Sequence, residues 1–140
     1  MRHIVGVAEM KVSRTRGDVI VTHALGSCLG IAVHDPVAGV GGLLHVMMPE
    51  GRMNAEKAAA NPFMFVDTGV PAFFREIYSA GGVKPRLVLK VAGGANVHRA
   101  ANDRFQIGKR NYIILKKLLW KNSVLIDAED VGGDAARTMY

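Results

Sequence analysis

Several classes of protein are excluded by what this sequence lacks. Cys28 is the only cysteine among 140 residues, so the chain cannot form an internal disulfide and offers no zinc site built on several cysteines. No apolar run approaches the roughly 20 residues that cross a bilayer, and the first residues lack the apolar stretch of a secretory leader. We therefore expect a cytoplasmic protein without direct membrane insertion and without a metal or other cofactor.

Acidic residues are also few. Twelve Asp and Glu stand against 18 Lys and Arg, which gives a formal net charge of +6 and a sequence pI of about 9.8. Such a balance favours an acidic partner. The bases are scattered, with no arginine-rich arm, no aromatic-interleaved motif and no zinc-finger spacing, so we expect no sequence-specific binding of nucleic acid.

Repeats, low-complexity tracts and linkers are absent as well, which predicts a single domain over residues 1–140. Short β-branched runs bounded by turn residues predict strands over 4–12, 18–22, 29–34, 42–48, 86–91 and 124–126. Amphipathic spacing predicts helices over 67–80, capped by Asp67 or Thr68, and over 111–121, while the Ala-rich segment 54–60 is either a short helix or a mobile loop. Because strands predominate and the first ones are hairpin-like, the fold class is mixed α/β with largely antiparallel sheets.

The geometry of one predicted hairpin, 29–34 with 42–48, bears on chemistry. Directly opposed residues in an antiparallel hairpin have a constant sum of residue numbers, here about 73 to 77 if the turn centres near Val37. An odd sum puts Cys28 and His45 on the same face, and an even sum separates them. If His45 lies opposite Gly30, the missing side chain leaves room for the ring to lean toward the thiol.

The chemistry centres on Cys28, the strongest nucleophile that the chain offers. A thiolate beside an imidazole can attack an amide or acyl carbon, and His45 is the histidine that the hairpin brings near. Ser27 is a weaker nucleophile, because a thiol reaches its anion at far lower pH. A buried, inert cysteine and a hydrogen-bonded strand histidine are the alternative interpretation. The other histidines lack such a setting: His3, His23, His34 and His98.

Glycines flank the cysteine in Gly26-Ser27-Cys28-Leu29-Gly30. They let a substrate backbone approach closely, which makes Gly26 and Ser27 the substrate-binding candidates. The same Gly-x-Cys-x-Gly spacing occurs at the nucleophile elbow of glutamine amidotransferases, but a helix must follow an elbow directly. Here the next residues predict a strand, so we do not expect an elbow.

Several short segments, spread from about Val5 to Arg137, match one known family in the same order. They are Val19-Ile20-Val21-Thr22, Leu25-Gly26-Ser27-Cys28, Asp35-Pro36-Val37-Ala38, Leu44-His45-Val46-Met47, Val91-Ala92-Gly93-Gly94-Ala95, Ile107-Gly108-Lys109-Arg110-Asn111 and Ala128-Glu129-Asp130-Val131-Gly132-Gly133. Together they resemble the chemoreceptor glutamine deamidases, the CheD family.

This resemblance implies a fold, a site and an activity. The fold would be a sandwich of two sheets with helices packed outside, with Cys28 as the nucleophile, His45 as its histidine and Thr22 supporting the histidine. The activity would be hydrolysis of selected glutamine side chains to glutamate in the cytoplasmic helical bundle of methyl-accepting chemotaxis receptors. A CheC-type phosphatase is a further possible partner, and a non-catalytic adaptor that uses the same groove is the competing function.

Two protonation states of the dyad fit the sequence. His45 either takes the proton of Cys28 when the thiol attacks, or already holds it in a thiolate–imidazolium pair. The amide of Cys28 and a neighbouring amide of the glycine-rich loop are the expected donors to the oxyanion. Thr22 would accept a hydrogen bond from the other ring nitrogen and fix the tautomer.

Overall fold

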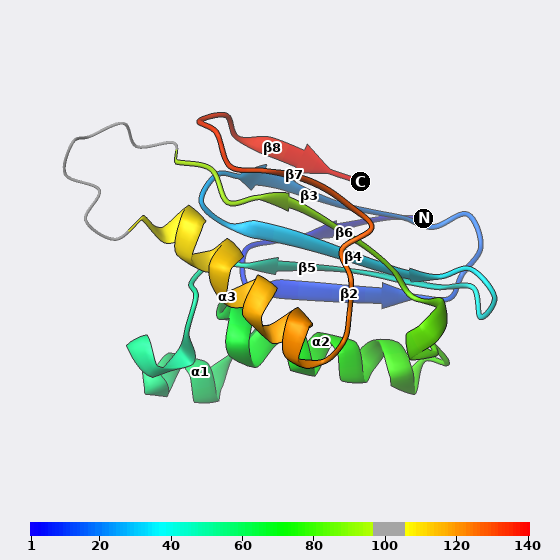
Figure 1. Cartoon of the computed structure of the whole chain (residues 1–140). Coiled ribbons are helices and arrows are strands. Elements are labelled where there is room, and N and C mark those ends of the chain that lie inside the picture. The colour runs from blue at the N-terminus through cyan, green and yellow to red at the C-terminus, as the bar shows by residue number, and fades with distance from the viewer. Residues whose placement is uncertain (97–105) are drawn as a thin grey trace.

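The computed structural model of the chain describes residues 1–96 and 106–140 (Figure 1). The strands are β1 Arg2–Val5, β2 Glu9–Ser13, β3 Val19–Leu25, β4 Leu29–Asp35, β5 Val40–Val46, β6 Val88–Gly93, β7 Ala128–Val131 and β8 Arg137–Met139. The α-helices are α1 Ala55–Ala60, α2 Val66–Ser79 and α3 Ile107–Lys121, and short 3-10 helices are η1 Gly51–Met53, η2 Pro62–Met64 and η3 Lys84–Arg86.

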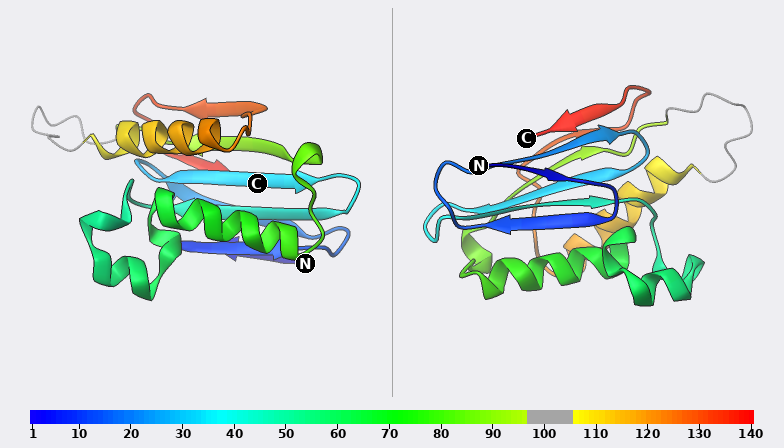
Figure 2. Two further views of the ribbon diagram at one scale, coloured as in Figure 1. Left: turned by 60° about the horizontal axis from the view of Figure 1, so that its bottom comes forward. Right: turned by 180° about the vertical axis from the view of Figure 1, so that it is seen from behind.

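The described strands form two sheets, with strand orders β1-β3-β8 and β2-β5-β4-β6-β7. The sheets lie one upon the other, and the helices lie together on the far side of the larger sheet (Figures 1 and 2). The pairs β1–β3 and β6–β7 are parallel, whereas the other ladders are antiparallel. This confirms the expected fold class, a mixed α/β sandwich of two largely antiparallel sheets with helices outside.

Alternation along the central hairpin divides its side chains between two interfaces. Leu29, Ile31 and Val33 of β4 are buried and belong to the core cluster that includes the apolar faces of α2 and α3. Their neighbours point the other way: a Cβ on Gly30 would lie 2.9 Å from side-chain atoms of Leu25 and Met139 in the smaller sheet. Residues that share the face of Gly30 therefore line the interior between the two sheets.

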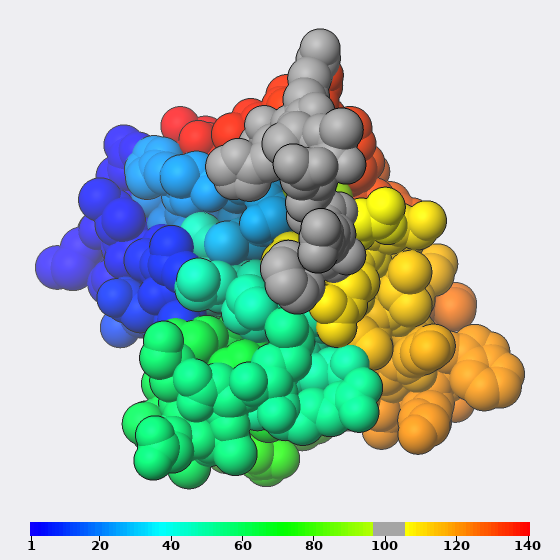
Figure 3. Space-filling model, turned by 90° about the vertical axis from the view of Figure 1, so that its left-hand side faces the viewer, coloured from blue at the N-terminus to red at the C-terminus, as the bar shows by residue number. Residues whose placement is uncertain are grey.

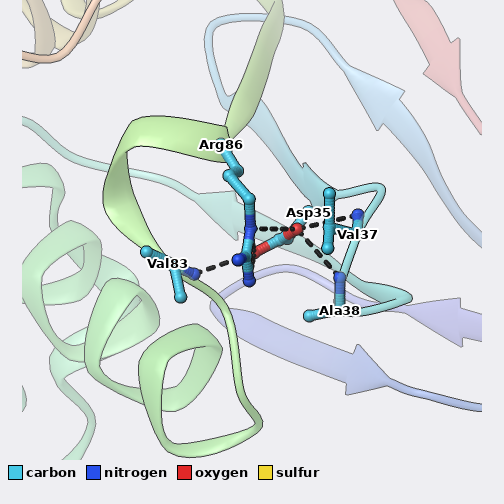
Figure 4. A network of polar contacts seen from close by, with 5 residues as sticks. All are labelled: Asp35, Val37, Ala38, Val83 and Arg86. Atoms are coloured by element: carbon cyan, nitrogen blue, oxygen red, sulfur yellow. Dashed lines mark hydrogen bonds and ion pairs between the residues drawn. The ribbon is translucent and has the colours of Figure 1, made fainter.

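A buried carboxylate fixes the turn of this hairpin (Figure 4). Asp35 accepts the amides of Val37 and Ala38, each at 3.0 Å, and so closes its own turn. It also accepts the Val83 amide at 2.9 Å and Nη2 of Arg86 at 2.9 Å, from the segment that leads into β6. The Arg86 guanidinium holds the pKa of Asp35 well below its usual range. The network ties the β4–β5 turn, and with it the register, to the rest of the domain.

Two strand predictions are wrong. Residues 4–12 form two strands in different sheets, because the chain turns at 6–8, where Ala8 adopts a positive φ of 60° that alternation does not reveal. Residues 124–126 are no strand: Leu125 is 84% exposed, while Val124 and Ile126 pack on the core as a link between α3 and β7. An apolar run in the sequence indicates only that its residues are buried, and a loop packed on the core buries them as a strand would.

The helix predictions need smaller corrections. α2 begins at Val66, and neither predicted residue caps it, since Asp67 accepts the amide of Gly51 and Thr68 donates to the carbonyl of Pro62. The undecided segment 54–60 contains α1, whose first turn is capped by the Asn54 side chain. α3 begins four residues earlier than the predicted 111–121.

Candidate active site

The hairpin has an odd register, the case in which alternation puts Cys28 and His45 on one face. Gly30 lies directly opposite His45 in the β4–β5 ladder, so the sum of paired residue numbers is odd. Cys28 directly precedes β4 and is partly buried, two residues from Gly30 and thus on the same face by alternation. The His45 side chain lies in the interior between the sheets, where it reaches Thr22, and the end of the molecule that carries the β3–β4 loop and the start of α3 faces the viewer in Figure 3.

A hydrogen-bond relay from the smaller sheet holds His45. Thr22 of β3 and His45 are both fully buried, and their Oγ1 and Nδ1 atoms lie 2.7 Å apart. The Thr22 hydroxyl also lies 2.7 Å from the carbonyl oxygen of Val5, to which it donates its only proton. The hydroxyl must then accept from His45, which fixes the proton on Nδ1 and the free lone pair on Nε2.

That lone pair has no partner. Nε2 of His45 is buried and makes no hydrogen bond within residues 1–96 and 106–140, so the thiol of Cys28 does not donate to it in this state. An unpaired buried acceptor is costly, and one at a suspected site indicates a function that needs a free base. Catalytic hydrogen bonds often close only when substrate binds.

Burial sets the resting protonation of the dyad. Desolvation raises the pKa of the Cys28 thiol, with a smaller opposing effect of its own amide, and desolvation lowers the pKa of His45. Both shifts favour the uncharged forms. The geometry therefore supports a neutral thiol and a neutral imidazole at rest, the first of the two protonation states that the sequence allowed.

The loop formed by Gly26, Ser27 and Cys28 is held in place through its carbonyl groups. The carbonyls of Gly26, Ser27 and Cys28 accept hydrogen bonds, each of 2.9 Å, from the Ala95 amide, the Asn111 side chain and the Gly94 amide in that order. In the described part of the chain, the Ser27 and Cys28 amides donate to no other residue. The two amides stay candidate donors to an oxyanion, and the expected substrate contacts at Gly26 and Ser27 stay a prediction.

Two glycines with close backbone contacts make this arrangement possible. A Cβ on Gly93, whose φ is +106°, would lie 2.2 Å from the Cys28 carbonyl oxygen, and one on Gly108 would lie 2.5 Å from the carbonyl oxygen of Ala95. A side chain at either glycine would displace the backbone that it contacts. From the sequence, Gly93 and Gly108 were assigned no role of their own, although both lie in segments that carry the family resemblance.

Asn111 is a further residue that sequence reasoning assigned no role. Its side chain is fully buried in α3, and its Nδ2 atom donates to the carbonyl of Ser27 at 2.9 Å and to that of Met47 at 3.1 Å. The helix prediction began at this residue, so a polar side chain facing inward one turn into α3 was not anticipated. It contacts both chain segments of the dyad.

The remaining histidines take no part in this arrangement. His3 bonds Asp18, His23 lies beside Thr138, and His34 is exposed. His98 lies outside the described residues. Across the described ranges, no three His, Cys, Asp or Glu side chains gather as a metal ion would require, and no helix has the length and apolarity to span a membrane.

Comparison with known proteins gives consistent matches. Residues 47–140 match the model of the family described as CheD chemotactic sensory transduction. The chain is 45% identical to "Probable chemoreceptor glutamine deamidase CheD 1" of Syntrophus aciditrophicus, over 97% of this chain and 84% of that protein. It is 42% identical to "Probable chemoreceptor glutamine deamidase CheD" of Solibacter usitatus, over 97% and 80%, and 39% identical to the protein of that name in Pyrococcus abyssi, over 97% and 82%.

The alignments with these relatives extend across the segment from Thr22 to His45, which precedes the match with the family model. Identity at this level over nearly the whole chain agrees with the order of motifs found in the sequence. The chain belongs to the CheD family.

Proposed function

We propose that this protein hydrolyses glutamine side chains of methyl-accepting chemotaxis receptors to glutamate, with release of ammonia, through a dyad of Cys28 and His45. The observation that carries the proposal is the buried lone pair on Nε2 of His45, which has no partner among the described residues and is fixed in place by Thr22 near the loop of the only cysteine. The names of the relatives supply the substrate class.

The first half of the reaction forms a thioester. Nε2 of His45 removes the proton of Cys28 as the sulfur attacks Cδ of the glutamine side chain, and the carbonyl oxygen becomes an oxyanion. The Ser27 and Cys28 amides donate to that oxygen. The imidazolium then gives its proton to the amide nitrogen, the C–N bond breaks, and ammonia leaves.

The second half is hydrolysis. His45, neutral again, removes a proton from water as the water oxygen attacks the thioester carbonyl. Collapse of this second oxyanion breaks the C–S bond, and the proton returns to the Cys28 sulfur. The products are a glutamate side chain and the free thiol, so no cofactor is consumed.

Thr22 acts as a positioning residue in this scheme. Its hydroxyl accepts the Nδ1 proton, so the ring keeps the tautomer in which Nε2 is the base. When the imidazolium forms, the same hydroxyl still accepts from Nδ1. Because threonine is neutral, it orients the ring more than it stabilises the positive charge.

A receptor substrate implies where this protein acts and which partners it meets. The receptor's cytoplasmic helical bundle would put the protein in the cytoplasm, and the net charge of +6 suits an acidic helical surface. A CheC-type phosphatase is a further candidate partner. The competing adaptor function gives no reason for a buried base that has no hydrogen-bond partner among the described residues.

Intact mass spectrometry separates the two functions. A purified receptor cytoplasmic fragment, incubated with the protein, should gain about 1 Da for each glutamine converted, because an amide nitrogen is replaced by an acid oxygen. Ammonia should appear in equal amount. An adaptor would co-purify with the fragment and leave its mass unchanged, which would refute the proposed activity.

A further inference from the structure

We infer that Asn111 is a positioning residue of the active site, a side-chain brace that sets the distance between the Cys28 loop and the strand of His45. This inference rests on the proposed function. Its basis is that one amide group joins both partners of the dyad: Nδ2 donates to the Ser27 carbonyl, next to Cys28, and to the Met47 carbonyl, two residues after His45.

The orientation of the amide follows from its partners. Both neighbours of Nδ2 are carbonyl oxygens, which can only accept, so the NH2 group must point to them and its two protons serve one bond each. The reversed amide would place Oδ1 against two oxygens. Nothing else in the described chain bonds the carbonyl of Met47.

The brace leaves Oδ1 of Asn111 buried without a partner. Oδ1 of Asn111 and Nε2 of His45 are the two buried side-chain polar atoms without a hydrogen bond in the described part of the chain. An unpaired buried oxygen lowers the stability of the fold. Stability alone therefore does not explain why an asparagine occupies this position. Such unpaired groups concentrate at functional sites, which agrees with a role in geometry.

The brace lies just beyond the end of the β4–β5 ladder. β4 and β5 pair from Leu29–Val46 onward, so the ladder ends before it reaches Cys28 and Met47. Without Asn111, the Ser27 carbonyl loses its link to the Met47 carbonyl, and past the Leu29–Val46 pair only the Gly94 and Ala95 amides, among the described residues, hold the loop, which leaves room for a small shift between the two segments. A displacement of about 1 Å is enough to lower turnover by about a hundredfold when reacting groups must meet.

The test uses Asn111→Ala, which removes both bonds, and Asn111→Asp, which keeps the shape but has no donor when ionised. Asn122→Ala is the matched control, because Asn122 ends the same helix and its side chain bonds only the Leu118 carbonyl at the surface. For protein shown to be folded by circular dichroism, we expect kcat for receptor-fragment deamidation to fall by about a hundredfold in both Asn111 variants, with KM within about twofold.

A residue with a merely structural role would lower the melting temperature and leave kcat of the folded protein unchanged, and that result in either variant would overturn the inference. Asn122→Ala should match the wild type in kcat. Cys28→Ala, assayed alongside, separates this failure from that of the proposed function. If Cys28→Ala is as active as the wild type, the dyad is wrong; if it is inactive while the Asn111 variants keep full kcat, only the brace is wrong.

Discussion

Replacing Thr22 by valine perturbs the orientation of His45 while preserving the volume of the side chain. The change removes two hydrogen bonds of 2.7 Å and leaves the Nδ1 proton of His45 buried without its partner. An unsatisfied buried group costs about 1–3 kcal/mol, so the free energy of unfolding should fall by about 1–3 kcal/mol.

The effect on catalysis has a different origin. Without an acceptor at Nδ1, the ring can turn or place its proton on Nε2, and the base is then present for part of the time only. We expect kcat/KM for deamidation to fall by about ten- to a hundredfold, which corresponds to about 1.4–2.7 kcal/mol of barrier.

Thr22→Ser is the matched control. Serine keeps the hydroxyl and both of its bonds and loses one methyl group, which costs about 0.8 kcal/mol of stability. Its kcat/KM should stay within about threefold of the wild type. Urea unfolding and mass-spectrometric deamidation assays on both variants measure the two effects. The relay would be refuted by full activity of folded Thr22→Val, or by an equal loss in Thr22→Ser.

Two further predictions concern the dyad and its loop. Because burial lowers the pKa of His45, its neutral base form persists to lower pH. The acid limb of the kcat/KM profile against pH should therefore have its midpoint below about 6.5, the ordinary pKa of imidazole. A midpoint above that value would contradict a buried neutral base. Gly93→Ala places a Cβ 2.2 Å from the Cys28 carbonyl oxygen and should abolish activity or folding. Gly39→Ala is the control, because Gly39 also has a positive φ but a Cβ there meets no atom within 4 Å, and it should lower stability alone. Equal behaviour of the two variants in both assays would argue against close packing around Gly93.

The sequence predicted the parts of this structure that depend on local pattern. The Asp35-Pro36 turn and the β-branched runs around it limited the hairpin to a few registers, one of which is the observed pairing of His45 with Gly30. The same reasoning failed at Ala8, where a single residue of positive φ sends neighbouring strands to different sheets. A backbone dihedral leaves no trace in hydrophobic alternation.

Contacts between segments that are far apart in the chain could not be predicted from the sequence, for a physical reason. The Thr22–His45 bond crosses from one sheet to the other, and without the family resemblance Thr22 reads as an ordinary β-branched strand residue. Asn111 reaches Ser27 across 84 positions of chain, and no spacing rule connects them. The protonation of the dyad likewise depends on burial between two sheets, which only the fold reveals.

The most direct test of the account measures deamidation by Cys28→Ala and His45→Ala against His34→Ala, a control in which the exposed histidine of the same hairpin is removed. We expect both dyad variants to fold and to lose essentially all production of glutamate in the receptor fragment, because the two groups act as one unit, while His34→Ala keeps the wild-type rate. Activity in Cys28→Ala above about a tenth of the wild type, equivalent to about 1.4 kcal/mol of barrier, would contradict a cysteine nucleophile.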